Sequence, residues 1–161
     1  HEKNNYKSLV ESGQFYEYFM ERFNIPASKR DDTKQIILTG LFSDENRPAD
    51  SRYLDYFSKD FPQITSYIKK IKNTDFGIKY IGDDYYKNLI CLLQREESKF
   101  VIEKVVYEFI NRYEGEFIST IHDSIVVTTK MLPEAEQLMK ECFQTEGIQP
   151  QLKVTEFIRE R

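Results

Sequence analysis

The sequence predicts an α+β fold in which a small antiparallel sheet containing a β-hairpin is covered by several helices. Helical apolar spacing recurs through most of the chain up to Tyr113. Two β-branched runs then flank a short polar link at His122-Asp123-Ser124, as in a hairpin. A helical pattern and an alternating run complete the chain. This order, helices first and a sheet afterwards, favours α+β over an alternating parallel-sheet fold.

Five helices are expected before the hairpin. Asn24-Ile25-Pro26 ends the first helix, in which Gly13 is a weak point. Ser28 is the expected cap of the second helix, because Asp31 and Asp32 would then occupy its first turn, where the helix dipole favours acids. The expected helices cover 6–23, Ser28 to about Phe42, about 53–61, a stretch opened by Pro62, and about Asp84 to Tyr113.

The C-terminal part carries the predicted sheet. Phe117–Ile121 and Ile125–Thr128 are the two expected hairpin strands. Pro133 should begin an amphipathic helix that ends near Thr145. An alternating last strand is expected through Leu152, Val154 and Phe157.

We expect two regions, a helical region at 1–83 and a region with the long helix and hairpin at 84–161. A chain of 161 residues fits one domain or two small lobes. A hydrophobic content of 40% with 14% aromatic residues argues against disorder. The net charge of −4 excludes binding of nucleic acid through bulk positive charge.

The cysteines and the hydropathy indicate a soluble, cytoplasmic protein. Cys91 and Cys142 are too few and too far apart for a zinc site or a disulfide scaffold. No apolar run approaches the roughly 20 residues of a membrane span. The chain begins at His1 without an initiator methionine, so we expect a fragment of a longer protein.

Asp123 is the first candidate for chemistry. Two stiff apolar strands would hold its carboxylate at the hairpin turn, as phosphoryl transfer by two metal ions requires. An aspartate that only forms an Asx-turn is the alternative interpretation.

A second set of candidates lies on the helix expected after Ser28. Arg30, Lys34, Leu38 and Phe42 follow one another at intervals of four, which places them near one helix face. A triphosphate along this face would meet two cations and, further on, an aromatic ring for its base. The alternative is a solvated face of an amphipathic helix. The same alternatives apply to Lys69, Lys70 and Lys72, with a phosphate backbone as the possible ligand.

Together these motifs resemble family A DNA polymerases and single-subunit RNA polymerases. Arg30-x3-Lys34-x7-Phe42 is similar to the fingers-helix motif Arg-x3-Lys-x7-Tyr-Gly. His122-Asp123 within two β-branched runs resembles the His-Asp hairpin of the palm. Gln94, on the long helix between them, resembles the glutamine of the family's helix before that hairpin.

The resemblance implies a role for each residue. Asp123 would bind catalytic Mg²⁺, and His122 would support the hairpin or contact the primer end. Arg30 and Lys34 would bind the phosphates of a nucleoside triphosphate, with Lys34 also donating a proton to pyrophosphate. Phe42 would stack near the new base pair, and Gln94 would touch the minor groove of the primer–template duplex. The partners implied are nucleic acid, nucleoside triphosphates and the remaining, N-terminal polymerase segments.

Three departures from the family pattern qualify this picture. Phe42-Ser43 replaces Tyr-Gly, and Ser124 stands where the bacterial repair enzymes have glutamate, as in phage-like members. Residues 1–30 contain no aspartate, although the family's first metal-binding aspartate lies on a strand before the fingers helix. We therefore expect that this strand either lies upstream of His1 or has been lost. We also expect a two-ion site that is incomplete in this chain, and no polymerase activity from the chain alone.

Other interpretations stay open. Gly82-Asp83-Asp84 is similar to the hairpin of viral RNA-dependent RNA polymerases, but Asp83 is better explained as a cap of the long helix. Glu97 interrupts an apolar stripe of that helix, which predicts either a buried partner or a stripe that opens onto a nucleic-acid groove. A non-catalytic nucleic-acid-binding module and an unrelated α+β interaction domain are the alternative functions.

Overall fold

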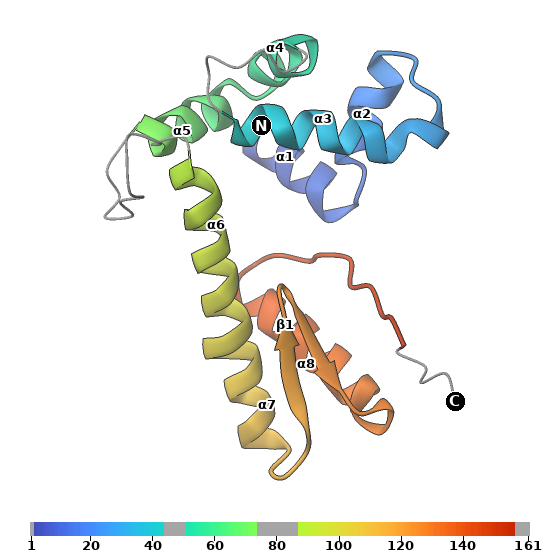
Figure 1. Ribbon diagram of the computed structural model, residues 1–161, viewed down its shortest axis with the longest axis vertical. Coiled ribbons are helices and arrows are strands. Elements are labelled where there is room, and N and C mark those ends of the chain that lie inside the picture. The colour runs from blue at the N-terminus through green and yellow to red at the C-terminus, as the bar shows by residue number, and fades with distance from the viewer. Residues whose placement is uncertain (1, 44–50, 74–86, 157–161) are drawn as a thin grey trace. The chain divides into compact units, whose positions relative to one another are not determined.

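The computed structural model describes residues 2–43, 51–73 and 87–156 and confirms the α+β class. In these ranges, helices accompany a single two-stranded antiparallel sheet (Figure 1). The chain divides into two compact units, His1–Leu93 and Gln94–Arg161. Three of the expectations lie outside the described residues. These are the boundary between residues 83 and 84, the connector at 73–82 apart from its first residue, and the cap at Asp83.

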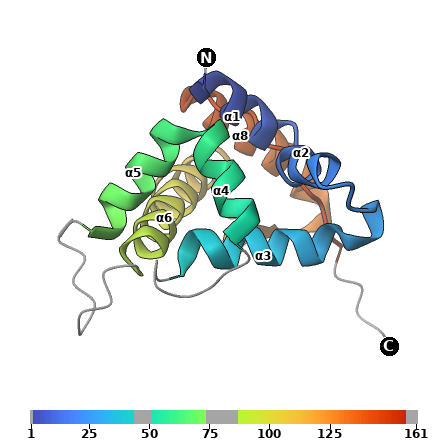
Figure 2. The same cartoon turned by 90° about the horizontal axis from the view of Figure 1, so that it is seen from above.

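The first unit is helical. Its elements are α1 (Glu2–Glu11), α2 (Phe15–Arg22), the 3₁₀-helix η1 (Ala27–Lys29), α3 (Arg30–Phe42), α4 (Ser51–Asp60) and α5 (Pro62–Asn73). The helix α4 packs against both α3 and α5, as the view in Figure 2 shows. The buried core consists mostly of aromatic rings, namely Phe15, Phe19, Tyr53, Phe57 and Phe61, together with Ile37. Phe15 meets both Phe19 and Phe57 edge to face, the arrangement that the aromatic quadrupole favours.

The expected single helix at 6–23 is wrong, because the chain turns a corner at Gly13. Gly13 has φ +72°, a conformation that costs glycine little. Its N–H donates to the Val10 carbonyl at 3.1 Å, and the N–H of Gln14 donates to the Leu9 carbonyl at 2.9 Å. These two bonds are those of a Schellman motif, which satisfies the last carbonyls of α1. Gly13 therefore ends one helix rather than weakening the middle of another.

The same motif ends α2, with asparagine in place of glycine. Asn24 has φ +53°, and the N–H of Ile25 donates to the Met20 carbonyl at 2.8 Å. Ser28 does not cap α3, contrary to expectation. Pro26 begins a 3₁₀ turn, Lys29 occupies the N-cap position, and no side chain bonds there. Because this turn includes Ser28, the α-helix begins only at Arg30.

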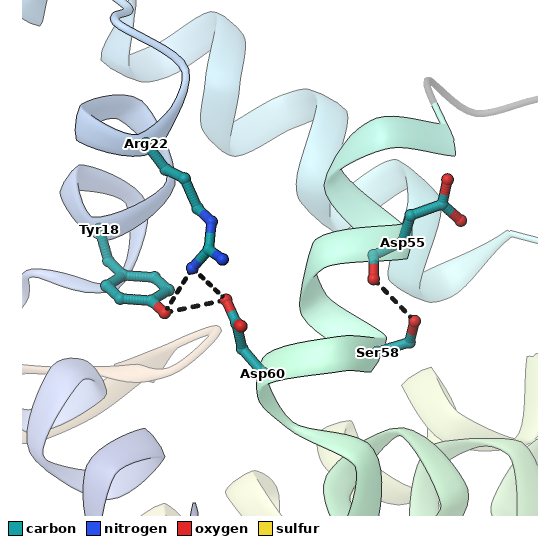
Figure 3. Close-up of polar contacts among 5 residues, drawn as sticks. All are labelled: Tyr18, Arg22, Asp55, Ser58 and Asp60. Atoms are coloured by element: carbon teal, nitrogen blue, oxygen red, sulfur yellow. Dashed lines mark hydrogen bonds and ion pairs between the residues drawn. The ribbon is translucent and has the colours of Figure 1, made fainter.

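A polar network ties α2 to the end of α4. The Tyr18 hydroxyl donates to Asp60 Oδ2 at 2.9 Å, and Arg22 Nη1 donates to the same oxygen at 2.8 Å (Figure 3). Burial raises the pKa of Tyr18, and the bond to Asp60 adds to this rise. At the start of α5, Glu2 Oε1 accepts the N–H groups of Gln63 and Ile64. These hydrogen bonds join α1 to α5. The dipole of α5 also favours a carboxylate at this position.

The second unit contains the sheet. Its elements are α6 (Asn88–Ser98), which spans the division between the units, the π-helix η3 (Lys99–Val106), α7 (Tyr107–Arg112), β1 (Ile118–Ile121), β2 (Ser124–Val127), the 3₁₀-helix η4 (Thr129–Met131) and α8 (Leu132–Thr145). The unit's cluster of buried residues, called the hairpin core below, consists of Val105, Phe109, Met131, Ala135, Leu138 and Cys142.

The long helix exists but does not keep its predicted apolar stripe. Val101, Val105 and Phe109 are buried, whereas Ile90, Leu93 and Glu97 are exposed. Eight residues of η3 are π-helical, so the α-helical period does not continue through them. Glu97 therefore needs no buried partner, and that half of its prediction is wrong.

The end of the chain is partly as expected. The helix α8 starts at Leu132 with Pro133 in its first turn, and Gly147 (φ +69°) closes it with another Schellman pair of bonds. The predicted last strand is wrong for its described part. Residues 148–156, the C-terminal segment, belong to no strand, and Phe157 lies outside the described residues. A strand needs a hydrogen-bonded neighbour, and no described strand pairs with this segment.

The corner at Gly13 yields a stability prediction. We expect Gly13→Ala to lower the free energy of unfolding by about 1–2 kcal/mol, because a Cβ disfavours positive φ. Asn24→Gly should change it by no more than about 0.5 kcal/mol, since glycine suits the same motif. Urea unfolding followed by circular dichroism measures both. Equal urea midpoints for Gly13→Ala and the unmodified chain would contradict the assignment of this corner.

Candidate active site

Asp123 lies at the tip of the β-hairpin, as the sequence predicts. The register pairs Ile121 with Ser124, so His122 and Asp123 are the two residues of the turn. Both side chains are exposed. The Ser124 hydroxyl donates to Asp123 Oδ1 at 3.3 Å, which leaves most of the hydrogen-bonding capacity of the carboxylate for a ligand.

The turn is held in an unusual conformation. His122 has φ +54°, whereas Asp123 has no positive φ. A positive φ at only the first central residue is the pattern of a type II′ turn, which normally takes glycine there. The hairpin thus accepts a local conformational cost at the residue beside the candidate metal ligand.

The inner face of the hairpin is anchored in the second unit. Ile118, Ile125 and Val127 pack against the hairpin core. The residues of this core come from η3, α7, η4 and α8, so helical segments cover the inner face of the hairpin. Asp123 therefore projects from a supported element, as a metal ligand or catalytic group requires.

A cavity of about 490 Å³ lies along β2, and we call it the β2 slot. One wall is formed by residues 125–128, and the opposite wall by residues 152–156 of the C-terminal segment. The floor is formed by α8 through Leu132, Ala135 and Met139. These three residues recur at helical spacing and form an apolar face of the helix, and Glu136 lines the slot beside them.

The wall formed by β2 presents free backbone groups. In a two-residue hairpin the residues next to the turn exchange both hydrogen bonds, so Ser124 and Val126 point their backbone groups at β1. The N–H and C=O groups of Ile125 and Val127 then point to the opposite edge. Within the described part of the chain, no backbone bond of this edge to the C-terminal segment occurs. The β2 slot is thus bordered by a strand edge that is able to accept another strand.

Arg30, the first predicted phosphate ligand, is already engaged within the first unit. Its Nε donates to Glu17 Oε1, and its Nη2 lies 3.5 Å from the Gly13 carbonyl oxygen. The guanidinium lies over the Tyr16 ring, 5.4 Å from the ring centroid. The hydrogen bond to Glu17 raises the pKa of Arg30. Sequence reasoning missed Glu17, because only the corner at Asn24 and the 3₁₀ turn after it bring α2 to the start of α3.

The other residues of α3 differ in exposure. Lys34, one turn after Arg30, is exposed and has no ion pair among the described residues. Phe42 is half-buried in the last turn. Two members of the predicted basic cluster on α5, Lys69 and Lys70, are exposed, but Lys72 is buried and donates to the Ser43 carbonyl at 2.8 Å. A solvated face is therefore wrong for Lys72.

The structure brings the candidates together in two groups. His122 and Asp123 share the hairpin turn of the second unit, and Gln94 is exposed on α6 in the same unit. Arg30, Lys34 and Phe42 share α3 of the first unit. Each group lies within one unit.

The described residues do not form a complete metal site. Among them, no three His, Cys, Asp or Glu side chains lie together in a way that could hold a metal ion. Asp123 offers one carboxylate, whereas magnesium prefers an octahedral set of oxygen ligands. A two-ion site would therefore need a further carboxylate beside the tip.

No helix within residues 2–43, 51–73 or 87–156 is long and apolar enough to cross a membrane. Comparison of the chain with protein-family models, curated proteins and solved structures finds no match.

The positive φ at the hairpin turn can be tested by substitution. We expect His122→Val to lower the free energy of unfolding by about 1–2 kcal/mol, because a β-branched residue is disfavoured at positive φ. His122→Gly should unfold at the same or a higher urea concentration than the unmodified chain. Equal stability of the Val and Gly variants would show that the turn does not hold this conformation in solution.

Proposed function

We propose that this chain is the C-terminal fingers-and-palm portion of a template-directed DNA polymerase of the family A type. The observation that carries the proposal is the placement of Asp123. It is exposed at the tip of a supported hairpin, and the second hairpin strand borders an open slot. Nucleotidyl transfer by two metal ions needs one such fixed carboxylate and a second one opposite.

The β2 slot is large enough for a short strand and offers it a hydrogen-bonding edge. In the proposal, this strand carries the second carboxylate. One strand residue occupies about 160 Å³ at the usual rise, strand spacing and sheet thickness. The slot of about 490 Å³ thus has room for about three residues. The free groups of Ile125 and Val127 supply hydrogen bonds for a strand, and Leu132, Ala135 and Met139 supply an apolar floor.

The direction of such a strand would bring its end to Asp123. In Figure 1 both β2 and the C-terminal segment descend from the level of the hairpin tip. A strand antiparallel to both would run upward and end beside the tip, and antiparallel pairs are the commoner kind. An aspartate at that end would face Asp123. In the proposal this strand belongs to the polypeptide that precedes His1.

The remaining proposed roles concern the nucleotide and the nucleic acid. Arg30 and Lys34, one turn apart on α3, carry the charges for the triphosphate. Phe42 provides a ring for the base pair, and Gln94 and His122 are exposed for contacts to the duplex. The proposal places the enzyme in the cytoplasm, where the free thiols Cys91 and Cys142 would stay reduced.

The chain alone should be inactive as a polymerase. Asp123 without a second carboxylate offers too few hard oxygen ligands for Mg²⁺. The net charge of −4 also gives little attraction for a duplex. The proposed active unit is therefore the longer protein with its upstream strand.

The role of Asp123 can be tested in that longer protein. We expect Asp123→Asn to lower primer extension by at least about a thousandfold, because the neutral amide loses the charge that holds the metal ions. Glu114→Gln, an exposed neutral substitution in the same unit, is the matched control and should retain activity. Single-turnover incorporation measures both, with circular dichroism as the check on folding. Normal extension by Asp123→Asn would overturn the proposal.

Occupancy of the β2 slot can be tested by amide hydrogen exchange. In the 161-residue chain, the N–H groups of Ile125 and Val127 should exchange faster than those of Ser124 and Val126, which face β1. In the longer protein, the first pair should become protected by about a hundredfold or more, because a docked strand accepts their hydrogen bonds. The second pair serves as the internal control.

The two experiments separate the alternatives. If the N–H groups of Ile125 and Val127 exchange as fast in the longer protein as in the 161-residue chain, no strand enters the slot. Protection without any effect of Asp123→Asn would favour a non-catalytic nucleic-acid-binding module on the same scaffold.

A further inference from the structure

The contacts of Arg30 are confined to one edge of its guanidinium. Nε and Nη2 form the side edge of the group, and these atoms face Glu17 Oε1 and the Gly13 carbonyl oxygen. The Tyr16 ring lies against the guanidinium plane. One acceptor is the corner residue Gly13, and the other, Glu17, lies in the first turn of α2. The Arg30 guanidinium is therefore held along one edge by residues that lie outside α3.

The opposite edge of the guanidinium keeps its donors. The arginine guanidinium carries five N–H donors on three nitrogens. In the described ranges, Arg30 makes its hydrogen bonds through Nε and Nη2 only. The side chain is 42% exposed. Lys34 follows one turn later on α3 and is exposed as well. An anion that reached the free edge of Arg30 could thus also meet the Lys34 ammonium.

Glu17 is well placed to hold Arg30 in one orientation. Its side chain is 28% exposed, less than that of its partner, and its Oε2 atom is shielded from solvent. A fixed acceptor removes rotamer freedom from arginine before any ligand arrives, so less entropy is lost on binding. The negative charge of Glu17 opposes an anion nearby, whereas its acceptor oxygen helps. The two effects can be separated chemically, because glutamine keeps the acceptor and removes the charge.

We infer that Glu17 is a positioning residue for a polyphosphate ligand. It holds the side edge of Arg30, so that the other edge and Lys34 face the phosphates of a nucleoside triphosphate. This inference rests on the proposed function, and it adds a residue that no motif of the sequence contains. The acceptor oxygen of Glu17, rather than its charge, performs this role.

Calorimetric titration of the 161-residue chain with inorganic tripolyphosphate, at low ionic strength and without divalent metal, tests the inference. Glu17→Gln should bind as tightly as the unmodified chain or more tightly, since the acceptor stays and the repulsion is lost. Glu17→Ala should bind about three- to tenfold more weakly than Glu17→Gln, because Arg30 is no longer oriented. Glu21→Ala, an exposed glutamate of the same helix, is the matched control and should not weaken binding.

A spectroscopic measurement distinguishes positioning from general stability. The Arg30 Nε–H signal in a ¹H–¹⁵N spectrum should be protected from exchange in the unmodified chain and in Glu17→Gln, and lost in Glu17→Ala. Thermal unfolding of each variant verifies the fold. Tripolyphosphate affinity equal in Glu17→Ala and Glu17→Gln would overturn the inference.

Variants of the cations test the proposed function separately. Arg30→Gln and Lys34→Gln should each lose about tenfold or more in affinity, the value of a charged hydrogen bond. If neither substitution changes the affinity, or if the unmodified chain binds no tripolyphosphate, the proposed nucleotide contact fails and the inference with it. If both weaken binding while Glu17→Ala equals Glu17→Gln, only the role of Glu17 fails.

Discussion

The candidate active site depends on the packing of the hairpin's inner face onto the hairpin core. A two-stranded hairpin alone is at best marginally stable in water. Burial of Ile118, Ile125 and Val127 contributes about 1–2 kcal/mol for each side chain, given that all three are only partly buried. The side chains of the hairpin core come from four helical segments, namely η3, α7, η4 and α8. Without this contact nothing would fix the turn that carries Asp123.

The same packing explains why a cavity exists beside β2. The inner face of the hairpin packs against the hairpin core, and α8 also lines the β2 slot with Leu132, Ala135 and Met139. A strand edge beside an apolar floor is a place where proteins otherwise aggregate, so natural proteins usually cover it. This physical liability supports, independently of the motif resemblance, the proposal that another strand completes the sheet.

The first unit meets a different constraint: under the proposed function, a chain of net charge −4 must concentrate positive charge locally to hold phosphates. Two Schellman corners, at Gly13 and Asn24, fold α1, α2 and α3 around an aromatic core. These corners also bring the Gly13 carbonyl and Glu17 of α2 to Arg30 at the start of α3. Helix termination and the orientation of a candidate ligand-binding residue thus have one structural cause.

Local patterns in the sequence were enough to determine the α+β class, the helices α4, α5 and α8, and the hairpin with Asp123 in its turn. These features depend on short-range periodicity, on Pro62 and Pro133, and on β-branched runs, all of which act between neighbours in the chain. The helix end at Gly13 was within reach as well, because glycine at a helix end has a known signature.

Only the tertiary structure decided the remaining features. The pairing of Arg30 with Glu17, the burial of Lys72 against Ser43 and the exposure of Glu97 depend on which helix faces lie against other elements. The C-terminal segment has the alternating pattern of a strand and yet forms none among the described residues, because a strand is defined by its neighbour. The sequence determines whether apolar and polar side chains alternate, but a strand forms only where another backbone lies alongside to share its hydrogen bonds.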